Sequence, residues 1–313
     1  MLTGVGAALH GASLDEGLRA LRAGDYASAR AELEPLAEAG HPEALAWLAW
    51  LYEHGRGVPR DPQKALTLFR EAAARGSTLA MRSLAYRYAR GQGVHEDWAT
   101  AFTWWLKAAE AGDPEAQYAV GVSLFHGRGT ERDVDAAVAW WRKAAEAGVD
   151  EARLDLARIL ADPEQEPYDI EQAVELYELL AIKGHLDAQL ALVWLYKDGE
   201  LLPRDLSKAR VWARRVAEQD PTLGEMLLAG IDLDQEPTAE NLRLMTAATL
   251  RLIEDRTEEL KRRHVYEGML DHLCALDAVE VDNAKEAAVK REVLEEVLSF
   301  LERLRAQGET PCR

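Results

Sequence analysis

One stretch near the carboxyl end of the chain, HVYEGMLDHLC at residues 264–274, contains residue types that could do chemistry. His264, Glu267 and Asp271 are spaced at i, i+3 and i+7, so a helix would place them on one face. Imidazole and carboxylate groups that converge in space can bind a metal ion. The same spacings are common on the charged, solvent-exposed face of an ordinary helix. We favour the exposed face and keep a metal-dependent enzyme that uses these C-terminal helices as the less favoured alternative.

Other catalytic signatures are weak or missing. Cys274 has no histidine partner that the sequence identifies, and with Cys312 it makes only two cysteines, too few for a disulfide framework. The sequence has no nucleophile elbow, P-loop or zinc-protease motif. Three glycine pairs lack the third glycine and the preceding strand of a phosphate-binding loop, so we interpret them as turns. These pairs are Gly55/Gly57, Gly91/Gly93 and Gly127/Gly129. We therefore predict no catalytic residues, no metal and no cofactor.

The composition limits the class of partner. The 313 residues carry a formal net charge of −18, and so acidic a surface repels a phosphate backbone. We therefore expect no nucleic acid but a neutral or basic protein as the partner. No apolar run approaches the ~20 residues of a membrane-spanning helix. The opening MLTGVGAALHGAS lacks the basic start and clear cleavage site of a signal peptide. We expect a cytoplasmic location, or a periplasmic one if a signal peptide has been removed.

The elements that organise the chain are helices that recur every 36 residues. Each copy has an aspartate, then an alanine four residues later, and five of the six close on a glycine. Aspartate is a favoured N-cap because its carboxylate accepts from the first free amides of a helix. Alanine lets two helices approach closely, and glycine adopts the left-handed conformation that ends a helix. The aspartates are Asp25, Asp61, Asp97, Asp133, Asp169 and Asp205, and the glycines are Gly40, Gly76, Gly112, Gly148 and Gly184.

A further helix precedes each of these and keeps the same period. It starts, for example, at Pro42, Thr78 and Pro114, and short linkers such as GRGVPRD (55–61) connect it to the aspartate. Each repeat therefore predicts a hairpin of a first helix, a linker and a second helix. An apolar column on the first helices supports this interpretation: Leu48, Leu84, Val120, Leu156 and Leu192. We find no sustained period-two pattern that would predict a strand.

Alanine columns, G-x-G-V linkers, aspartate N-caps and the WWxKAAEAG motif at this period resemble the Sel-one-like repeat (SLR), a branch of the tetratricopeptide superfamily. The resemblance covers roughly residues 15–220. It implies an all-α, right-handed superhelical solenoid of about six 36-residue hairpins, followed by a C-terminal helical segment. Two linkers depart from the pattern: DPEQEPYD (162–169) has lost both glycines and DGELLPRD (198–205) keeps one. We expect these hairpins to join at a different angle.

The resemblance also places a binding surface, because first helices line the concave groove in the tetratricopeptide superfamily. A column of large side chains follows these helices, and Tyr, Trp and Arg dominate binding hot spots. We predict that the groove residues are Trp50, Arg82, Tyr86, Tyr118, Arg158 and Trp194. The alternative is that they only pack against the preceding hairpin. Aromatic columns on the second helices, such as Phe69, Trp105, Trp141 and Tyr177, are expected to fill the core.

Residues 221–313 leave the repeat. We predict an N-terminal segment at 1–14, expected to be disordered, a solenoid at 15–233, and a C-terminal segment at 234–313. In that segment a helical stretch is expected from about Thr238 to Val279, with a break near Gly268. A final helix places Val293, Val297, Phe300, Leu301 and Leu304 on one face. That face either caps the solenoid or forms a dimer or partner surface, and we favour the cap.

These features predict a non-catalytic protein-interaction solenoid. Relatives in the resembling family include bacterial envelope or signalling scaffolds and immunity proteins that neutralise secreted antibacterial toxins. The acidic composition suits a basic toxin or effector by charge complementarity. Our sharper hypothesis is therefore an immunity-type inhibitor, with an envelope or signalling scaffold as the alternative.

Overall fold

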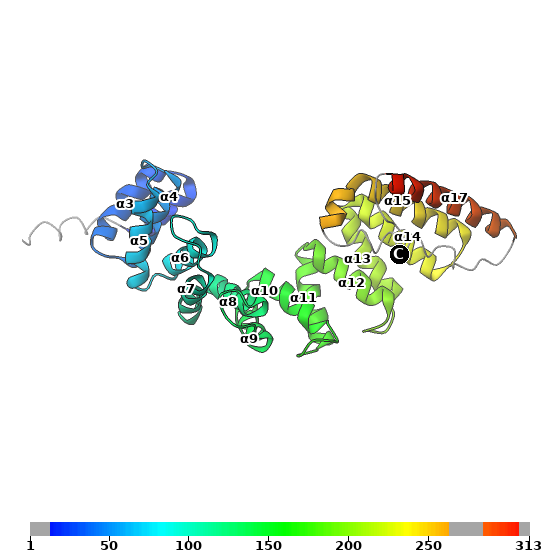
Figure 1. The fold of residues 1–313 in the computed structure, drawn as a ribbon, viewed down its shortest axis with the longest axis horizontal. Helices are drawn as coiled ribbons and strands as arrows, with labels where there is room; N and C mark the ends of the chain where they lie inside the picture. The colour runs from blue at the N-terminus through cyan, green and yellow to red at the C-terminus, as the bar shows by residue number, and fades with distance from the viewer. Residues whose placement is uncertain (1–12, 263–283, 307–313) are drawn as a thin grey trace, which may run out of the picture. The chain divides into compact units, whose positions relative to one another are not determined.

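The fold was analysed in a computed structural model, which describes residues 13–262 and 284–306. These ranges contain fifteen helices and no strand (Figure 1). The helices are α2 (Leu14–Ala23), α3 (Tyr26–Glu38), α4 (Pro42–His54), α5 (Pro62–Ala74), α6 (Thr78–Arg90), α7 (Trp98–Glu110), α8 (Pro114–His126), α9 (Val134–Glu146), α10 (Asp150–Leu160), α11 (Ile170–Ile182), α12 (Leu186–Asp198), α13 (Leu206–Gln219), α14 (Pro221–Gln235), α15 (Ala239–Arg262) and α17 (Ala284–Ala306). The expected all-α solenoid of repeating helix pairs is confirmed, and the pairs α2/α3, α4/α5, α6/α7, α8/α9 and α12/α13 pack as hairpins.

The repeated aspartates are the N-caps of the second helices, as predicted. In all six copies the aspartate Oδ1 accepts a hydrogen bond from the backbone N–H three residues on, at distances between 2.9 and 3.1 Å. The backbone N–H of the aspartate itself donates to the end of the first helix, as Asp61 does to the Tyr52 carbonyl at 2.9 Å. One residue therefore starts the second helix and also ties it to the first.

The linkers between the two helices of a hairpin use glycine and arginine. Gly55, Gly91 and Gly127 end the first helices with φ values of 64°, 63° and 67°, so the predicted turns are confirmed. In three linkers an arginine Nε donates back to a carbonyl at the end of the first helix, at 2.9 to 3.1 Å. These bonds join Arg60 to Glu53, Arg132 to Phe125 and Arg204 to Lys197.

Small residues let the helices of each hairpin pack closely. The alanines four residues after each N-cap, from Ala29 to Ala209, have no exposed surface. Gly121 takes the place of alanine where the indole of Trp141 lies directly against it, and a Cβ there would overlap that ring. The second-helix aromatics fill the core as predicted, since Phe69, Trp105, Trp141 and Tyr177 are at most 5% exposed.

The chain divides into two compact units between residues 159 and 160. The first unit contains the hairpins α2/α3 to α8/α9 and all of α10 but its last residue. The second contains α11 to α15 and α17. The boundary lies just before the linker 162–169, the linker that has lost both glycines.

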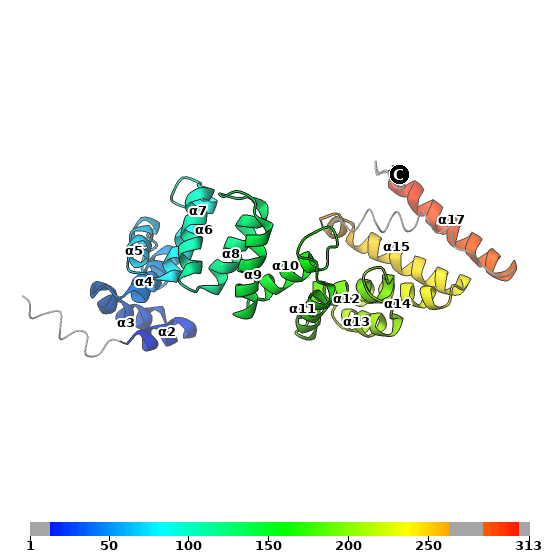
Figure 2. The same ribbon diagram turned by 90° about the horizontal axis from the view of Figure 1, so that it is seen from below.

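The last three helices that the structure describes, α14, α15 and α17, pack together. Helix α15 lies against both α14 and α17 (Figure 2). Val293, Val297, Phe300 and Leu301 of α17 are at most 5% exposed, and they share a cluster with residues of α14 and α15. The apolar face of the last helix is therefore covered by the chain's own helices. Gly268 lies outside the described residues, as does the side chain of Leu304.

Candidate protein-binding face

The first aromatic of the predicted groove, Trp50 on α4, is half-buried in a group of rings. Its indole stacks on His54 with ring centroids 4.5 Å apart, and Trp47 and Tyr26 lie at 6.3 and 6.1 Å. Trp50 also contacts the core of the first unit. Its side chain thus has both a packing role and a partly accessible surface.

Tyr86, one repeat later on α6, is more open. It is 39% exposed, and its ring meets the buried Trp105 edge to face at 5.4 Å. Partial burial raises the pKa of the Tyr86 phenol, so the hydroxyl stays protonated and can donate a hydrogen bond at neutral pH. The exposed part of the ring offers an amphipathic contact of the kind found in binding hot spots.

Three members of the predicted set make polar contacts within the first unit, and two of them, Arg82 and Tyr118, link neighbouring hairpins. Arg82 Nη1 lies 3.0 Å from Asp113 Oδ1, the N-cap of α8. Tyr118 donates its hydroxyl hydrogen to Asp155 Oδ2 at 3.0 Å, and Arg158 Nη1 lies 3.2 Å from Asp155 Oδ1. Burial and the carboxylate of Asp155 raise the pKa of Tyr118. Arg82 and Tyr118 are therefore held in place by the repeat stack, whereas Arg158 is an exposed side chain that pairs within its own helix, α10.

Trp194 belongs to the second unit, on α12. Its indole is 43% exposed, and Lys197 Nζ lies 5.5 Å from the ring. That ammonium also lies 3.0 Å from Asp234 Oδ2, so Trp194 sits beside an ion pair. Among the described residues, Trp194 and Tyr86 are the exposed aromatic members of the predicted set.

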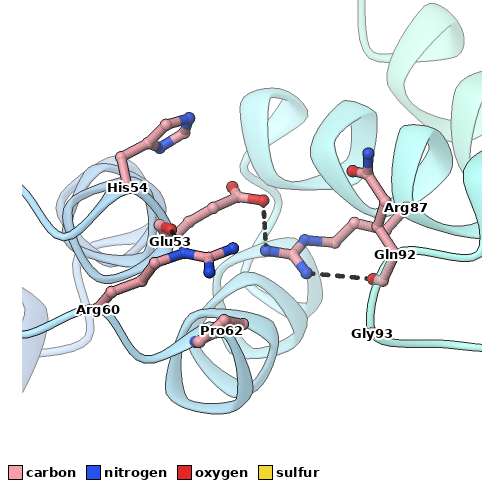
Figure 3. Close-up of a pocket in the computed structure, with 7 residues that line it drawn as sticks. All are labelled: Glu53, His54, Arg60, Pro62, Arg87, Gln92 and Gly93. Atoms are coloured by element: carbon pink, nitrogen blue, oxygen red, sulfur yellow. Dashed lines mark hydrogen bonds and ion pairs between the residues drawn. The ribbon is translucent and has the colours of Figure 1, made fainter.

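A pocket that the sequence analysis did not predict lies in the first unit, between the ends of α4 and α6. It has a volume of about 670 Å³. At its centre Arg87 Nη2 lies 2.7 Å from Glu53 Oε1, and Arg87 Nη1 donates to the Gln92 carbonyl at 3.3 Å (Figure 3). Arg87 is only 3% exposed, and its guanidinium lies 5.3 Å from the Phe69 ring. A buried charge in a repeat protein calls for a physical reason.

The sequence does contain a signal for this pocket, because Arg87 and Glu53 differ from the residues at equivalent positions of the other repeats. At steps of 36 residues, the positions equivalent to Arg87 hold Leu51, Ser123, Ile159 and Leu195. Those equivalent to Glu53 hold Ala89, Phe125, Ala161 and Lys197. Among these equivalent positions, only Glu53 and Arg87 form a pair of opposite charges. Both residues differ from the rest of their columns at the same junction between repeats.

The part of the chain that the structure describes contains no group of three or more His, Cys, Asp and Glu residues that could hold a metal ion. His264, Glu267, Asp271 and both cysteines lie outside the described residues. None of the described helices is long and apolar enough to cross a membrane.

A comparison with protein-family models identifies the repeat. The model described as Sel1 repeat matches residues 42–77, 78–113, 114–149, 150–185 and 187–221, which together exceed half of the chain. The chain belongs to the Sel1 repeat family. Proteins built from these repeats mediate protein–protein interactions. The α2/α3 hairpin precedes the first matched repeat and has the same aspartate cap.

Solved structures support the fold. A Sel1 repeat protein from Oxalobacter formigenes is 27% identical with a TM-score of 0.60, over 72% of this chain and 91% of that one. A protective antigen with an SLR fold from uropathogenic Escherichia coli is 23% identical with a TM-score of 0.66, over 86% of this chain and 56% of that one. An immunity protein from Pseudomonas aeruginosa is more distant, at 19% identity, a TM-score of 0.43, and coverage of 68% and 85%. That similarity is too low for an inference about this chain. A comparison with curated proteins gave no match.

Proposed function

We propose that this Sel1 repeat protein is a non-catalytic protein-binding solenoid that contacts its partner through the exposed side of its first helices. The observation that carries the proposal is the contrast between two sets of aromatics. Tyr86 and Trp194 on first helices are 39% and 43% exposed, whereas the second-helix column of Phe69, Trp105, Trp141 and Tyr177 is buried. Core packing explains the buried set but not the exposed one, and Tyr and Trp are typical anchors of protein interfaces.

A pull-down from lysate of the source organism, read by mass spectrometry, tests this face. Wild type is compared with Tyr86→Ala and with Trp194→Ala. The matched control is Leu179→Ala/Ile182→Ala, which removes two exposed apolar side chains, 43% and 67% exposed, from the second helix α11. We expect a protein that wild type and the control retain and that one or both aromatic variants lose. Equal retention by all four proteins would move the site away from the first helices.

For the class of partner we propose a basic secreted effector that the chain neutralises as an immunity-type inhibitor. The formal net charge of −18 supports this, because an acidic protein attracts a basic partner and speeds their encounter. The retained protein is then expected to be basic, to associate more slowly as salt is added, and to lose its activity in the complex. An acidic partner, or one that stays active in the complex, would favour an envelope or signalling scaffold instead.

A further inference from the structure

The Arg87 pocket exists because one linker packs differently from its neighbours in the first unit. The second linker glycine normally rests on the first turn of the preceding second helix. A Cβ on Gly57 would lie 2.7 Å from the Tyr26 carbonyl oxygen, and a Cβ on Gly129 would overlap the Trp98 backbone. The equivalent Gly93 has no such contact with Pro62, and both of these residues line the pocket instead.

Two arginines line this opening, and the one carboxylate among the lining residues, Glu53, pairs with Arg87. Arg60 and Arg87 both line the pocket, and Figure 3 shows the guanidinium of Arg60 pointing toward that of Arg87. Glu53 lies 2.7 Å from Arg87 Nη2, and Arg60 forms its one described hydrogen bond through Nε, to the Glu53 carbonyl. Two cations against one anion leave the pocket with a net charge of +1, in a chain whose formal charge is −18.

The donors of these arginines are not saturated. Arg60 is exposed, and its Nη groups have no hydrogen-bond acceptor among the described residues. Arg87 Nε is buried and has no hydrogen-bond acceptor either. Guanidinium groups bind carboxylates through paired N–H donors, and a buried positive charge gains from a second acceptor. Gln92 and Gly93, which also line the pocket, are exposed residues.

We propose that this pocket binds a carboxylate group of the partner protein, seated between Arg60 and Arg87. The inference deepens the proposed function and rests on it for the identity of the partner. A singly charged carboxylate balances the net charge of +1, whereas a doubly charged phosphate would meet excess repulsion from Glu53. His54 lines the same pocket and stacks on Trp50, so the carboxylate site is continuous with the aromatic surface of α4.

A titration with small anions tests the pocket without the partner. The full chain, labelled with ¹⁵N, is titrated with N-acetylglutamate α-amide, which carries a side-chain carboxylate, and with N-acetylglycine, which carries a main-chain one. Sodium phosphate and ionic-strength-matched sodium chloride form the other two arms. We expect saturable shifts of the Gln92 and Gly93 amides with at least one carboxylate, and the tighter one identifies the source. Shifts no larger than with chloride, or tighter binding of phosphate, would overturn the proposal.

Variants taken from the chain's own repeats sharpen the test. Arg60→Gln should weaken carboxylate binding several-fold, while Arg132→Gln, which removes the same linker bond at another junction, should leave it unchanged. Glu53→Ala/Arg87→Ser copies the equivalent pair Ala89 and Ser123 and should abolish binding in a folded protein. Unchanged binding in Arg60→Gln would overturn the site even if the double variant failed to fold. A negative titration would overturn the carboxylate site alone, because the pull-down with Tyr86→Ala and Trp194→Ala tests the aromatic face separately.

Discussion

The N-cap aspartates combine a structural role with a measurable electrostatic signature. Thr100 donates two hydrogen bonds to Asp97, from its hydroxyl at 2.6 Å and from its backbone N–H at 3.0 Å. The hydroxyl bond is the largest cause of the lowered pKa of Asp97, because both bonds stabilise the charged carboxylate. A lowered pKa in the folded state means that Asp97 favours folding above its unfolded pKa. That contribution is lost as pH falls through the folded value, below the ordinary 3.8.

Thr100→Val should therefore raise the pKa of Asp97 toward its ordinary value. The variant removes the hydroxyl donor and keeps the backbone N–H, so the rise is expected to be partial. Thr103→Val is the control, since the Thr103 hydroxyl bonds to the Ala99 carbonyl and leaves the cap intact. A ¹³C titration of the Asp97 side-chain carboxyl measures both. An unchanged midpoint in Thr100→Val would show that the hydroxyl bond does not form in solution.

Gly112 and Gly129 both adopt left-handed backbone conformations, but only Gly129 lies in close contact with another segment. Replacing each by alanine therefore distinguishes the cost of backbone strain from the cost of a steric clash. Gly112 has a φ of 92°, and a Cβ there would meet no neighbouring atom within 4 Å, so Gly112→Ala should cost about 1–2 kcal/mol of unfolding free energy from conformation alone. Gly129 has a φ of 73° and rests directly on the Trp98 backbone. Gly129→Ala must also displace that linker, so its loss should be clearly larger. Urea denaturation compares the two, and equal losses would mean that the linker moves freely.

At the scale of helices, the pairing of Glu53 with Arg87 joins two successive hairpins. Glu53→Ala would leave the buried Arg87 charge without its carboxylate, which should lower the unfolding free energy by about 3–5 kcal/mol. Glu53→Ala/Arg87→Ser removes both charges and should recover much of that loss. Urea denaturation of the two single variants and the double variant gives the coupling energy. Additive losses would show that the two residues act independently.

The helices and their ends followed from the sequence because their causes are local. An aspartate cap, an alanine four residues on and a terminal glycine each act within one or two turns, and the fixed register repeats the aspartate and alanine six times. The pocket could not be predicted in this way, because it depends on how one linker packs on the preceding second helix. The linker around Gly93 has Gln92 and Glu96 where the linkers around Gly57 and Gly129 have arginines, and Arg87 breaks its column, but these departures do not show how the linker packs on the preceding helix.

The predicted face shows the same limit. The repeat pattern predicted six groove residues on the first helices. It did not indicate which of their side chains contact the neighbouring repeat. Arg82 and Tyr118 bond to Asp113 and Asp155 across neighbouring hairpins, and those partners are 31 and 37 residues away. That the six residues contact a partner stays a prediction, which the Tyr86→Ala and Trp194→Ala variants test at the two exposed aromatics.

At the scale of the whole molecule, the last helix covers an apolar face that an open repeat array would leave in water. Repeat proteins need such terminal caps because each hairpin packs only on its neighbours. Phe300 is 3% exposed in the cluster with α14 and α15, whereas Leu298, two residues earlier on the same helix, is 58% exposed. The two positions therefore distinguish a cap formed within the chain from a face that another molecule covers.

Phe300→Ala should lower the unfolding free energy of the second unit by about 3–5 kcal/mol, the usual loss for a buried phenylalanine. Leu298→Ala should change it by less than about 0.5 kcal/mol, as at an ordinary surface site. Hydrogen exchange read by mass spectrometry would place the Phe300→Ala effect in α14, α15 and α17, and light scattering should give a monomer for all three proteins. A dimer that Leu298→Ala dissociates would instead make the exposed side of α17 an interface between two copies, because that side chain contributes nothing to the cap.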